Sequence, residues 1–499
     1  PIYLSKTFKE KFSLDAHIGA SIKDNRFDEL SVYGPIAGAP NIFNVVNLDK
    51  SQKKTPKTGW HEQTQSFFYS LELGWKSQLF VTTTGRNDWA SQLANSPQKS
   101  FFYPSVGVSW LPSSTFNFPE KFNYLKIRAS WASVANPFPR ELTIATHPYD
   151  DTISGWDDKS NYPIGQLYPE RTKTWELGFD ARFLHGFTLS ASWYRADTYN
   201  QTFNPNLSAS SGYSDIYIQT GHVRNTGVEA SLGYDHQWKN WNWNSQFTFS
   251  WNKNKIIELC KEWYNPITEE TITMNRLQIS KLGRAKFILK EGGSMGDLYS
   301  TTDLRRDDKG NIEIDEGGNV VVEDNLPDMK LGSVFPDYNL AWRNSVSWKN
   351  LNLGFLVTAR IGGIVNSLTQ ANMDLFGVSE ATAAARDAGG ALVNGRSLVN
   401  PETWYTAIAS QGGIPQYYTY SATNVRLQEL SLGYTIPRKW LHNICSITVS
   451  FVGRNLWMMY CKAPFDPEAV ASTNNFYQGM DYFMMPSTRN LGFNINIKF

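Results

Sequence analysis

The stretch NWNWNSQFTFSWN, residues 240–252, alternates between aromatic and polar side chains at almost every position. Its two sets are Trp241, Trp243, Phe247, Phe249 and Trp251 on one side, and Asn242, Asn244, Gln246, Thr248 and Ser250 on the other. Successive side chains of a β-strand point to opposite faces, so this pattern predicts a strand with one apolar and one polar face. The alternation is also longer than the five or six residues of an average strand in a soluble protein.

Similar rows recur along the whole chain of 499 residues and predict about fourteen strands. The rows lie near residues 12–23, 67–73, 79–81, 106–110, 125–131, 175–183, 187–193, 228–234, 241–251, 340–348, 352–361, 425–436, 446–455 and 488–499. We interpret the residues Pro1–Leu4 as the tail of one more strand. Fourteen is an even number, so a self-contained barrel of fourteen strands remains an alternative.

The connections between these rows are short on one side of the meander and long on the other. The long ones are residues 24–64, 87–100, 133–172, 197–222, 253–337, 362–423 and 456–487. Compact soluble domains rarely contain loops longer than about 15 residues without structure of their own. Long loops on one side and tight turns on the other are typical of an outer-membrane barrel, with the loops outside the cell.

Composition agrees with this interpretation. The net charge is +1, which argues against binding to nucleic acid, and no run of 18 apolar residues predicts a transmembrane helix. The three cysteines contain no C-x-x-C pair, and we expect no metal and no cofactor. We therefore predict an all-β fold, an antiparallel transmembrane β-barrel, over a soluble sandwich or propeller. Charged residues on the polar rows, such as Arg128 and Glu229, would face a wet lumen.

The last nine residues, LGFNINIKF, give the same alternation. Phe493, Ile495, Ile497 and Phe499 form its apolar face, which we predict to meet lipid. An aromatic last residue on such a strand is similar to the assembly signal of bacterial outer-membrane proteins. We expect this strand to pair with the first strand of the barrel and to place the C-terminus on the periplasmic side.

Several motifs, in the same order along the chain, resemble the SusC/RagA-like TonB-dependent transporters of Bacteroidetes outer membranes. They are GRNDWASQL (85–93), FFYPSVGVSWLPS (101–113), YPERTKTWELGFD (168–180), NTGVEASLGY (225–234), VRLQELSLGYTIP (425–437), VGRNLWMM (452–459) and FDPE (465–468). Each motif alone is weak, but together they cover the chain from about residue 1 to 499.

The resemblance implies a barrel of 22 strands around an N-terminal plug. About fourteen strands in residues 1–499 would then be its C-terminal portion, without the plug and without roughly eight strands. The chain would be a truncation, a cleavage product or a partial chain, and the missing portion would be its partner. The resemblance also implies outer-membrane lipids, the TonB complex acting through the plug, a SusD-like lipoprotein lid and a dimer of transporter–lid pairs.

Aromatic and amide side chains in the long loops are candidates for binding substrate, because flat rings stack on sugars. They are Trp156, Asp157, Trp404, Tyr405, Tyr417, Tyr418, Asn475 and Tyr477. The alternative is that these rings pack loops together or contact a lid. Loops on a rigid scaffold often carry recognition, so we expect the group to shape a ligand cavity.

Three kinds of function fit this sequence. The first, favoured by the resemblance, is TonB-energised import of oligosaccharides or peptides, and the second is a passive porin. The third is a surface-binding barrel without transport. An enzyme has little support: GGSMG (292–296) lacks the strand, helix and partners of a nucleophile elbow. The segment DDKGNIEID (307–315) lacks the spacing of a calcium-binding EF-hand, which favours a solvated turn.

Overall fold

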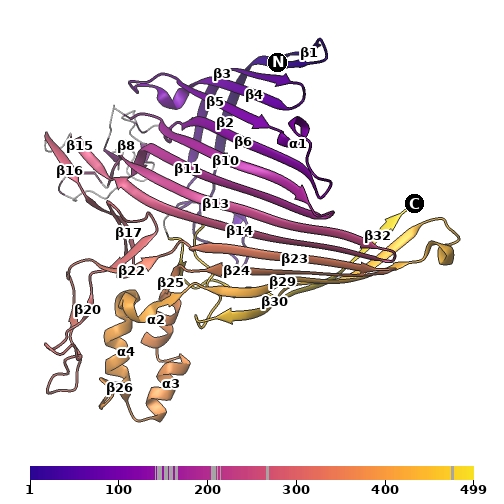
Figure 1. Ribbon diagram of the computed structural model, residues 1–499. Helices are drawn as coiled ribbons and strands as arrows, with labels where there is room; N and C mark the ends of the chain where they lie inside the picture. The colour runs from indigo at the N-terminus through magenta and orange to yellow at the C-terminus, as the bar shows by residue number, and fades with distance from the viewer. Residues whose placement is uncertain are drawn as a thin grey trace.

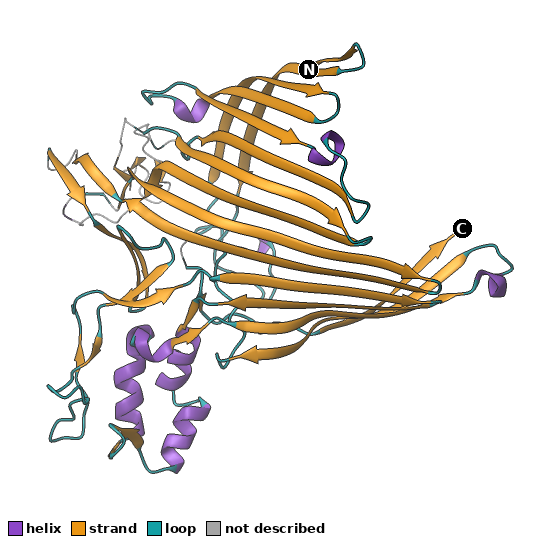
Figure 2. Ribbon diagram, viewed as in Figure 1, coloured by secondary structure: helices purple, strands orange, loops and turns teal. Residues whose placement is uncertain are grey.

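One antiparallel sheet of fifteen strands dominates the computed structural model (Figures 1 and 2). The structure describes residues 1–140, 142, 149–150, 155–156, 161–162, 167–203, 210, 212–213, 215–265, 269–473 and 477–499. The strands of this sheet, each paired with the next, are β1 (Ile2–Phe8), β2 (Phe12–Leu30), β3 (Lys57–Trp75), β4 (Leu79–Ala90), β5 (Phe101–Trp110), β6 (Phe122–Asn136), β10 (Glu170–Phe183), β11 (Phe187–Phe203), β13 (Ile218–Trp238), β14 (Trp241–Glu258), β23 (Tyr338–Trp348), β24 (Leu351–Ile361), β29 (Asn424–Ile436), β30 (Ser446–Cys461) and β32 (Asn490–Lys498).

The predicted number of about fourteen strands is one too low. Each of the fourteen alternating rows coincides with one strand of the sheet, the last of them extending beyond both ends of β32, and the additional strand is β1. The sequence predicts only a stub at Pro1–Leu4, whereas β1 continues to Phe8 and pairs along its whole length with β2. A strand of seven residues contains too few repeats for its period to be read with certainty.

The sheet is open. Within the described residues, β1 and β32 each have a strand partner on one edge only, and Figure 1 shows the two termini on separate parts of the sheet. The residues Phe493, Ile495 and Ile497 of β32 face their partners Phe451, Val449 and Ile447 of β30. The prediction that this terminal strand pairs with the first strand of a closed barrel therefore stays a prediction.

The strands are longer and the connections shorter than the sequence predicts. The connection expected at 24–64 spans 31–56, because β2 and β3 each contain 19 residues. The connections expected at 133–172, 197–222, 253–337 and 456–487 likewise begin later, at residues 137, 204, 259 and 462. Where a strand extends above a membrane, water lies on both of its faces, and its side chains need not alternate. The backbone hydrogen bonds to the neighbouring strands continue there, so the strand is longer than its alternating sequence.

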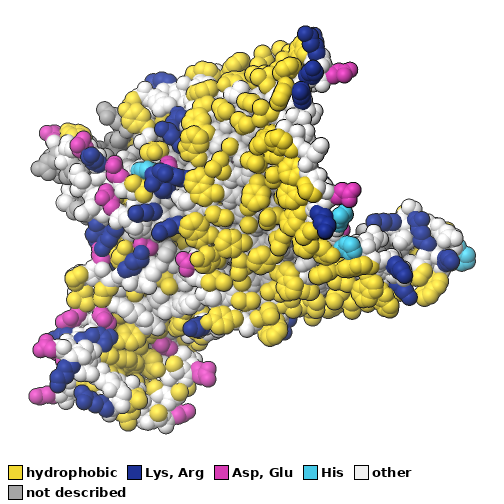
Figure 3. Space-filling view, viewed as in Figure 1, with side chains coloured by type: hydrophobic (Ala, Val, Ile, Leu, Met, Phe, Trp, Pro, Cys, Tyr) yellow, Lys and Arg dark blue, Asp and Glu magenta, His cyan; other side chains and the backbone are white. Residues whose placement is uncertain are grey.

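The outer face of the sheet carries a continuous apolar band, drawn in yellow in Figure 3. Exposed tryptophans border this band on the side of the short turns at Trp75, Trp110, Trp238, Trp241 and Trp348, and on the loop side at Trp175 and Trp193. Ten residue steps separate Trp241 from Trp251 along β14. At about 3.3 Å per residue and a tilt of about 45°, this distance corresponds to a band roughly 23 Å tall. A bilayer core flanked by aromatic girdles has this height.

The long connections on the loop side contain further secondary structure. A hairpin insert (residues 260–333) consists of β15 (Cys260–Asn265), β16 (Glu270–Met274), β17 (Arg276–Leu282), β18 (Ala285–Lys290), β19 (Asp297–Ser300), β20 (Asp303–Leu304), β21 (Val322–Glu323) and β22 (Met329–Ser333). A helical insert (residues 364–421) consists of β25 (Ile364–Ser367), α2 (Leu368–Leu375), α3 (Glu380–Asp387), β26 (Ala391–Val393), β27 (Ser397–Val399), α4 (Pro401–Ala409), α5 (Pro415–Tyr418) and β28 (Thr419–Ser421).

The fold is therefore mostly but not entirely β. Ser367, Ser379 and Asn400 accept hydrogen bonds from the first turns of α2, α3 and α4, which is why these short helices begin where they do. None of the helices among the described residues is both long and apolar enough to cross a membrane. The remaining short elements are α1 (Pro112–Thr115), β7 (Tyr149–Asp150), β8 (Gly155–Trp156), β9 (Asn161–Tyr162), β12 (Asp215–Ile216) and β31 (Met480–Asp481).

The two inserts pack together with the 462–489 connection into one body, which we call the loop cap. One hydrophobic core joins Leu304 and Val320 of the hairpin insert to Ile408 and Tyr418 of the helical insert. In a second core, Met480 packs with buried residues of both inserts. The short strands β25 and β31 pair in parallel, and the Ser367 hydroxyl donates to the Asp481 carboxylate at 2.6 Å. Three connections far apart in sequence thus form a single packed structure at the loop end of the sheet (Figure 1).

Candidate functional site

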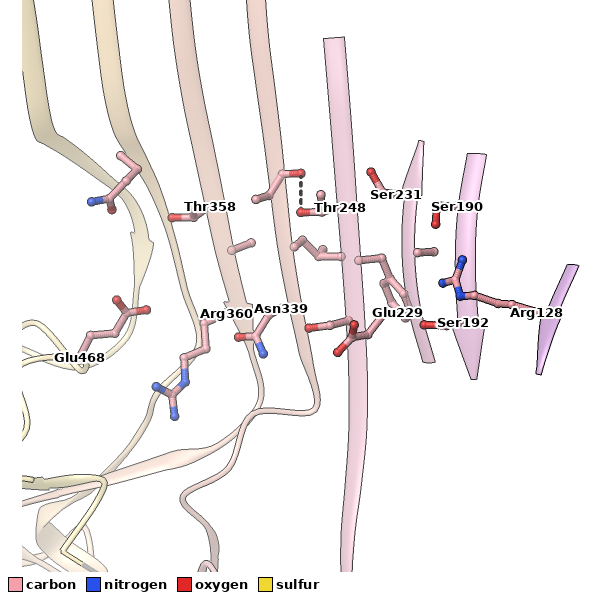
Figure 4. Close-up of a pocket in the computed structure, with 17 residues that line it drawn as sticks. Arg128, Ser190, Ser192, Glu229, Ser231, Thr248, Asn339, Thr358, Arg360 and Glu468 are labelled. Carbon is pink, nitrogen blue, oxygen red and sulfur yellow. Dashed lines mark hydrogen bonds between the residues drawn. The ribbon is translucent and has the colours of Figure 1, made fainter. Parts of the chain in front are cut away.

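A cavity of about 720 Å³ lies on the polar face of the sheet. Its wall includes a row of directly paired residues across neighbouring strands, Ser192, Glu229, Ser250, Asn339 and Arg360. Figure 4 shows the labelled members of this row together with Arg128 and Glu468. Because strand register aligns every second residue across the sheet, the alternating sequence alone brings these distant polar side chains to one surface.

At one end of the cavity, Arg128 of β6 lies across the neighbouring strand β10. Its Nη1 donates to the Asp180 carboxylate at 2.6 Å, and its Nε lies 3.6 Å from a Glu176 oxygen. The guanidinium occupies the space above Gly178, where a Cβ atom would come within 2.8 Å of it. The Ser190 hydroxyl also donates to Asp180 at 2.6 Å. Glycine at position 178 therefore allows a charged network to lie flat on the wall.

At the opposite end, Arg360 of β24 and Glu468 of the 462–489 connection form the rim of the cavity. The Arg360 Nη2 donates to the Val334 carbonyl at 2.9 Å, while its buried Nε has no hydrogen-bond partner in the structure. The cavity thus carries cationic and anionic groups at both ends, separated by hydroxyl and amide side chains. Such a wall can hydrogen-bond a polar substrate and attract charges of either sign.

Arg426 of β29 fixes the position of Glu468. Its guanidinium binds both carboxylate oxygens of Asp466, at 3.2 and 2.8 Å, and lies 3.4 Å from Glu468. Asn424 accepts from the Arg426 Nε and donates to Glu468 at 3.2 Å. Although burial opposes ionisation, hydrogen bonds from Arg426 and Ser487 hold the pKa of Asp466 below its usual value. The motif FDPE is therefore tied to the end of β29 by a buried ion pair.

The predicted binding residues Trp404, Tyr417 and Tyr418 belong to the core of the loop cap. Trp404 and Tyr417 pack edge to face with ring centroids 5.9 Å apart, and both lie against the core that joins the two inserts. Tyr418 is only 2 % exposed, and its hydroxyl donates to Asp374 at 2.9 Å. Burial raises the pKa of Tyr418 above its usual value. In this structure these three rings pack the loops together.

Tyr405, Tyr477 and Trp156 are more accessible. Tyr405 lines a second cavity of about 560 Å³ in the helical insert, next to Asp374, Arg386 and Glu402. Tyr477 is partly exposed with one edge against Phe287, and Trp156 is largely exposed. Asp157 and Asn475 lie outside the described residues. Of the predicted residues that the structure describes, Tyr405 lines the second cavity and the others line neither of the two cavities, and a role of the accessible ones in binding stays a prediction.

The segment DDKGNIEID forms turns. Asp307 accepts hydrogen bonds from the backbone N–H groups of Lys309 and Asn311, and Asp315 accepts from that of Asn319. The side chain and backbone of Asn311 hold the pKa of Asp307 below its usual value. Within the part of the chain that the structure describes, no group of three His, Cys, Asp or Glu side chains is placed to hold a metal ion.

The sequence analysis missed the cavity residues Arg360, Asn339 and Glu468. Asn339 and Arg360 could have been identified from their positions on the polar rows of their strands. In the sheet both are in register with Glu229. The pairing of Arg426 with Asp466 joins two motifs, VRLQELSLGYTIP and FDPE, that the sequence showed only as separate segments.

Breaking the buried pair should release the FDPE segment. Asp466→Asn removes the carboxylate that binds the Arg426 guanidinium, 6 % exposed, through both oxygens, and leaves Glu468 at 3.4 Å as a remaining counter-charge, so we expect a local cost of at most about 3–5 kcal/mol. Hydrogen exchange of the amides at 462–473 should accelerate accordingly. Because the folded pKa of Asp466 is lowered, the pair stabilises at neutral pH, and its contribution should be lost as the pH falls below about 4.

The exposed pair of Arg454 and Glu429 provides the matched control. It joins β30 to β29, with side chains 67 % and 28 % exposed. Glu429→Gln should cost less than about 1 kcal/mol and leave exchange in 462–473 unchanged. Equal effects of the two substitutions would contradict the structural role assigned to Arg426 and Asp466.

Comparisons with known proteins agree with this geometry. The chain is 26% identical to TonB-dependent receptor P3 of Formosa agariphila, over 98% of this chain and 51% of the relative. It is 21% identical to TonB-dependent receptor SusC of Bacteroides thetaiotaomicron, over 75% of this chain and 38% of SusC. The solved structure of the RagAB peptide transporter has the same fold, with a TM-score of 0.74 at 18% identity, over 100% of this chain and 54% of that one.

The chain thus spans about half the length of the curated relatives it matches. The model of the family "TonB dependent receptor-like, beta-barrel" matches residues 3–456, from the start of β1 into β30. The order of the strands, the apolar outer band and the polar inner wall are those of such a barrel. The chain belongs to the TonB-dependent receptor-like β-barrel family.

Proposed function

We propose that the full-length protein imports oligosaccharides or peptides across the bacterial outer membrane. The family to which the chain belongs consists of outer-membrane receptors and transporters rather than enzymes. The observation that carries the proposal is the cavity wall, where Arg128, Glu229, Arg360 and Glu468 surround hydroxyl and amide groups. These groups match substrates rich in hydrogen-bonding groups, and they lie on the face opposite the apolar band.

The loop cap favours an importer over a passive porin. A porin needs an open aqueous channel, whereas here three connections share hydrophobic cores and form a structured body at the loop end. A body of this kind can close over a substrate or receive a second protein. A barrel that binds ligands at the surface without transport remains the other alternative, since it would need the same cap.

The other components of the importer are proposed to come from the rest of the full-length protein and from partner proteins. The unpaired edges of β1 and β32 would be costly in lipid, where no water satisfies backbone groups. Further strands that complete a barrel of 22, together with a plug inside it, would satisfy them. The TonB complex would act on the plug, a SusD-like surface lipoprotein would cover the loop cap, and two such pairs would form a dimer.

In this proposal the short turns and the C-terminus lie on the periplasmic side. The long loops, including the hairpin and helical inserts, are extracellular. The apolar face of β32, Phe493 to Phe499, meets lipid and serves as the assembly signal. The residues Trp156, Asp157, Tyr405, Asn475 and Tyr477 are proposed to take part in substrate binding at the loops.

Uptake and conductance distinguish the importer from the porin. Cells that express the full-length protein should accumulate labelled oligosaccharides or peptides only while the proton-motive force is intact. In planar bilayers the purified protein should be almost silent, because the plug closes the barrel. Uptake that survives collapse of the proton-motive force, together with steady open-channel conductance, would favour the porin instead.

Substitutions of Tyr405 and Tyr418 in the helical insert distinguish a role in substrate binding from a role in packing. Tyr405→Ala should weaken uptake, seen as a several-fold higher substrate concentration for half-maximal rate, and should cost less stability than Tyr418→Ala, because Tyr405 is only partly buried against the core of the loop cap. Tyr418→Ala removes a fully buried ring and should destabilise the loop cap by about 3–5 kcal/mol. Thermal unfolding and uptake are measured on both variants. If Tyr405→Ala leaves uptake unchanged, the second cavity does not contribute to substrate binding.

A further inference from the structure

The short turns of the sheet carry a net positive charge that is larger than the net charge of the whole chain. The turns comprise residues 9–11, 76–78, 111–121, 184–186, 239–240, 349–350 and 437–445. They contain eight cationic residues, Lys9, Lys11, Lys76, Lys121, Lys239, Lys349, Arg438 and Lys439, against two anionic ones, Glu10 and Glu120. The turns therefore sum to +6, whereas the whole chain has a net charge of +1. The rest of the chain must sum to −5.

These cations are exposed and take part in no ion pair that the structure shows, in contrast to several arginines at the loop end of the strands. There, Arg86 pairs with Asp88, and the carboxylate of Asp197 binds both Arg195 and Arg224. A set of unpaired charges of one sign attracts a partner of the opposite sign. Several cations of the loop end are thus paired with carboxylates of the chain, whereas none of the eight turn cations has such a pair among the described residues.

The backbone of the turns gives an independent argument. Lys9, Lys76, Lys239 and Lys349 adopt left-handed conformations, with φ between 36° and 52°. Gly and Asn enter this region most easily, and they dominate tight hairpin turns for that reason. Lysine at four such positions is thus not explained by turn geometry. Its charge is the property that distinguishes it from the residues the backbone would favour.

The cations also continue directly from the apolar band. The ammonium groups of Lys76 and Lys349 lie over the rings of Trp75 and Trp348, at 4.9 and 5.2 Å from the ring centroids. Trp440, next to Lys439, is 69 % exposed. Figure 3 shows Lys and Arg side chains beyond the yellow band on the side of the short turns. Tryptophan marks the level of the headgroups, and long basic side chains reach from there to the phosphates.

We propose that the turn end of this barrel wall binds the phosphate groups of anionic phospholipids in the leaflet that it faces. The lysines at left-handed positions and the tryptophans beside them form a row of headgroup sites along the rim of the sheet. The proposal rests on the proposed function only in placing the strands across a bilayer. It does not depend on transport, on the substrate or on a lid.

The full-length protein is placed in phosphatidylcholine vesicles that contain either brominated phosphatidylglycerol, which is anionic, or brominated phosphatidylcholine. The test compares how strongly the protein associates with these two lipids. Bromine quenches nearby tryptophan fluorescence, so the quenching curves give the relative association of the two lipids. The native protein should prefer the anionic lipid, and this preference should fall in high salt. Each lysine near a membrane surface contributes about 1 kcal/mol, or roughly fivefold in association.

The test variant replaces Lys9, Lys76, Lys239 and Lys349 by Asn, which suits the left-handed backbone and preserves folding. It should lose the preference for the anionic lipid by about fivefold at each site. A second variant with Arg at the four positions should keep it. A control with Gln at Lys50, Lys53, Lys54 and Lys99, exposed lysines on the loop side, should also keep it.

Each outcome decides the proposal. An Asn variant that binds the anionic lipid as well as the native protein overturns it, and so does an equal loss in the loop-side control. If the Asn variant loses binding of an added polyanion but keeps its lipid preference, the turns face a different partner and the proposal fails. If neither brominated lipid quenches tryptophan in any variant, the strands do not span the bilayer, which is failure of the proposed function itself.

Discussion

The backbone ladder of the sheet is the constraint from which the rest of the structure follows. In hydrocarbon, each peptide N–H and C=O needs a partner within the protein, and fifteen antiparallel strands provide it along their length. A strand in such a ladder has two faces, so lipid on one side and water on the other impose alternation on its side chains. The same register that builds the apolar band aligns Glu229, Asn339 and Arg360 on the opposite face.

The two ends of the sheet are built differently. At the turn end, connections of two or three residues join most strands, and exposed tryptophans and lysines are concentrated there. At the loop end, several arginines are paired with carboxylates, and the long connections have hydrophobic cores of their own. Arg426 and Asp466 show how the two parts are joined, because a strand residue holds a loop motif beside the cavity. A rigid wall and a packed cap together can position a site that neither would form alone.

The sequence predicted the membrane-spanning part of the fold well and the rest less well. Fourteen strands were located because residues such as Trp243 and Phe249 alternate with polar ones. The extension of β2 to Leu30 was missed, because water on both faces removes the pattern there. Tyr418 packs in one core with Ile414 and with Leu304, which is more than a hundred residues away in the sequence. A local alternation of side chains carries no information about such a distant contact. Loop aromatics therefore resembled ligand contacts, although several of them pack the cap.

Spin labels placed at single cysteines along β14, from residue 241 to 251, would test the two-solvent account most directly. The full-length protein in a bilayer would be exposed in turn to oxygen, which concentrates in lipid, and to a water-soluble nickel complex. The account predicts a period of two, with oxygen access highest at Trp243, Phe247 and Phe249 and nickel access highest at Asn244, Gln246 and Thr248. Uniform nickel access along the strand, or no periodicity at all, would contradict it.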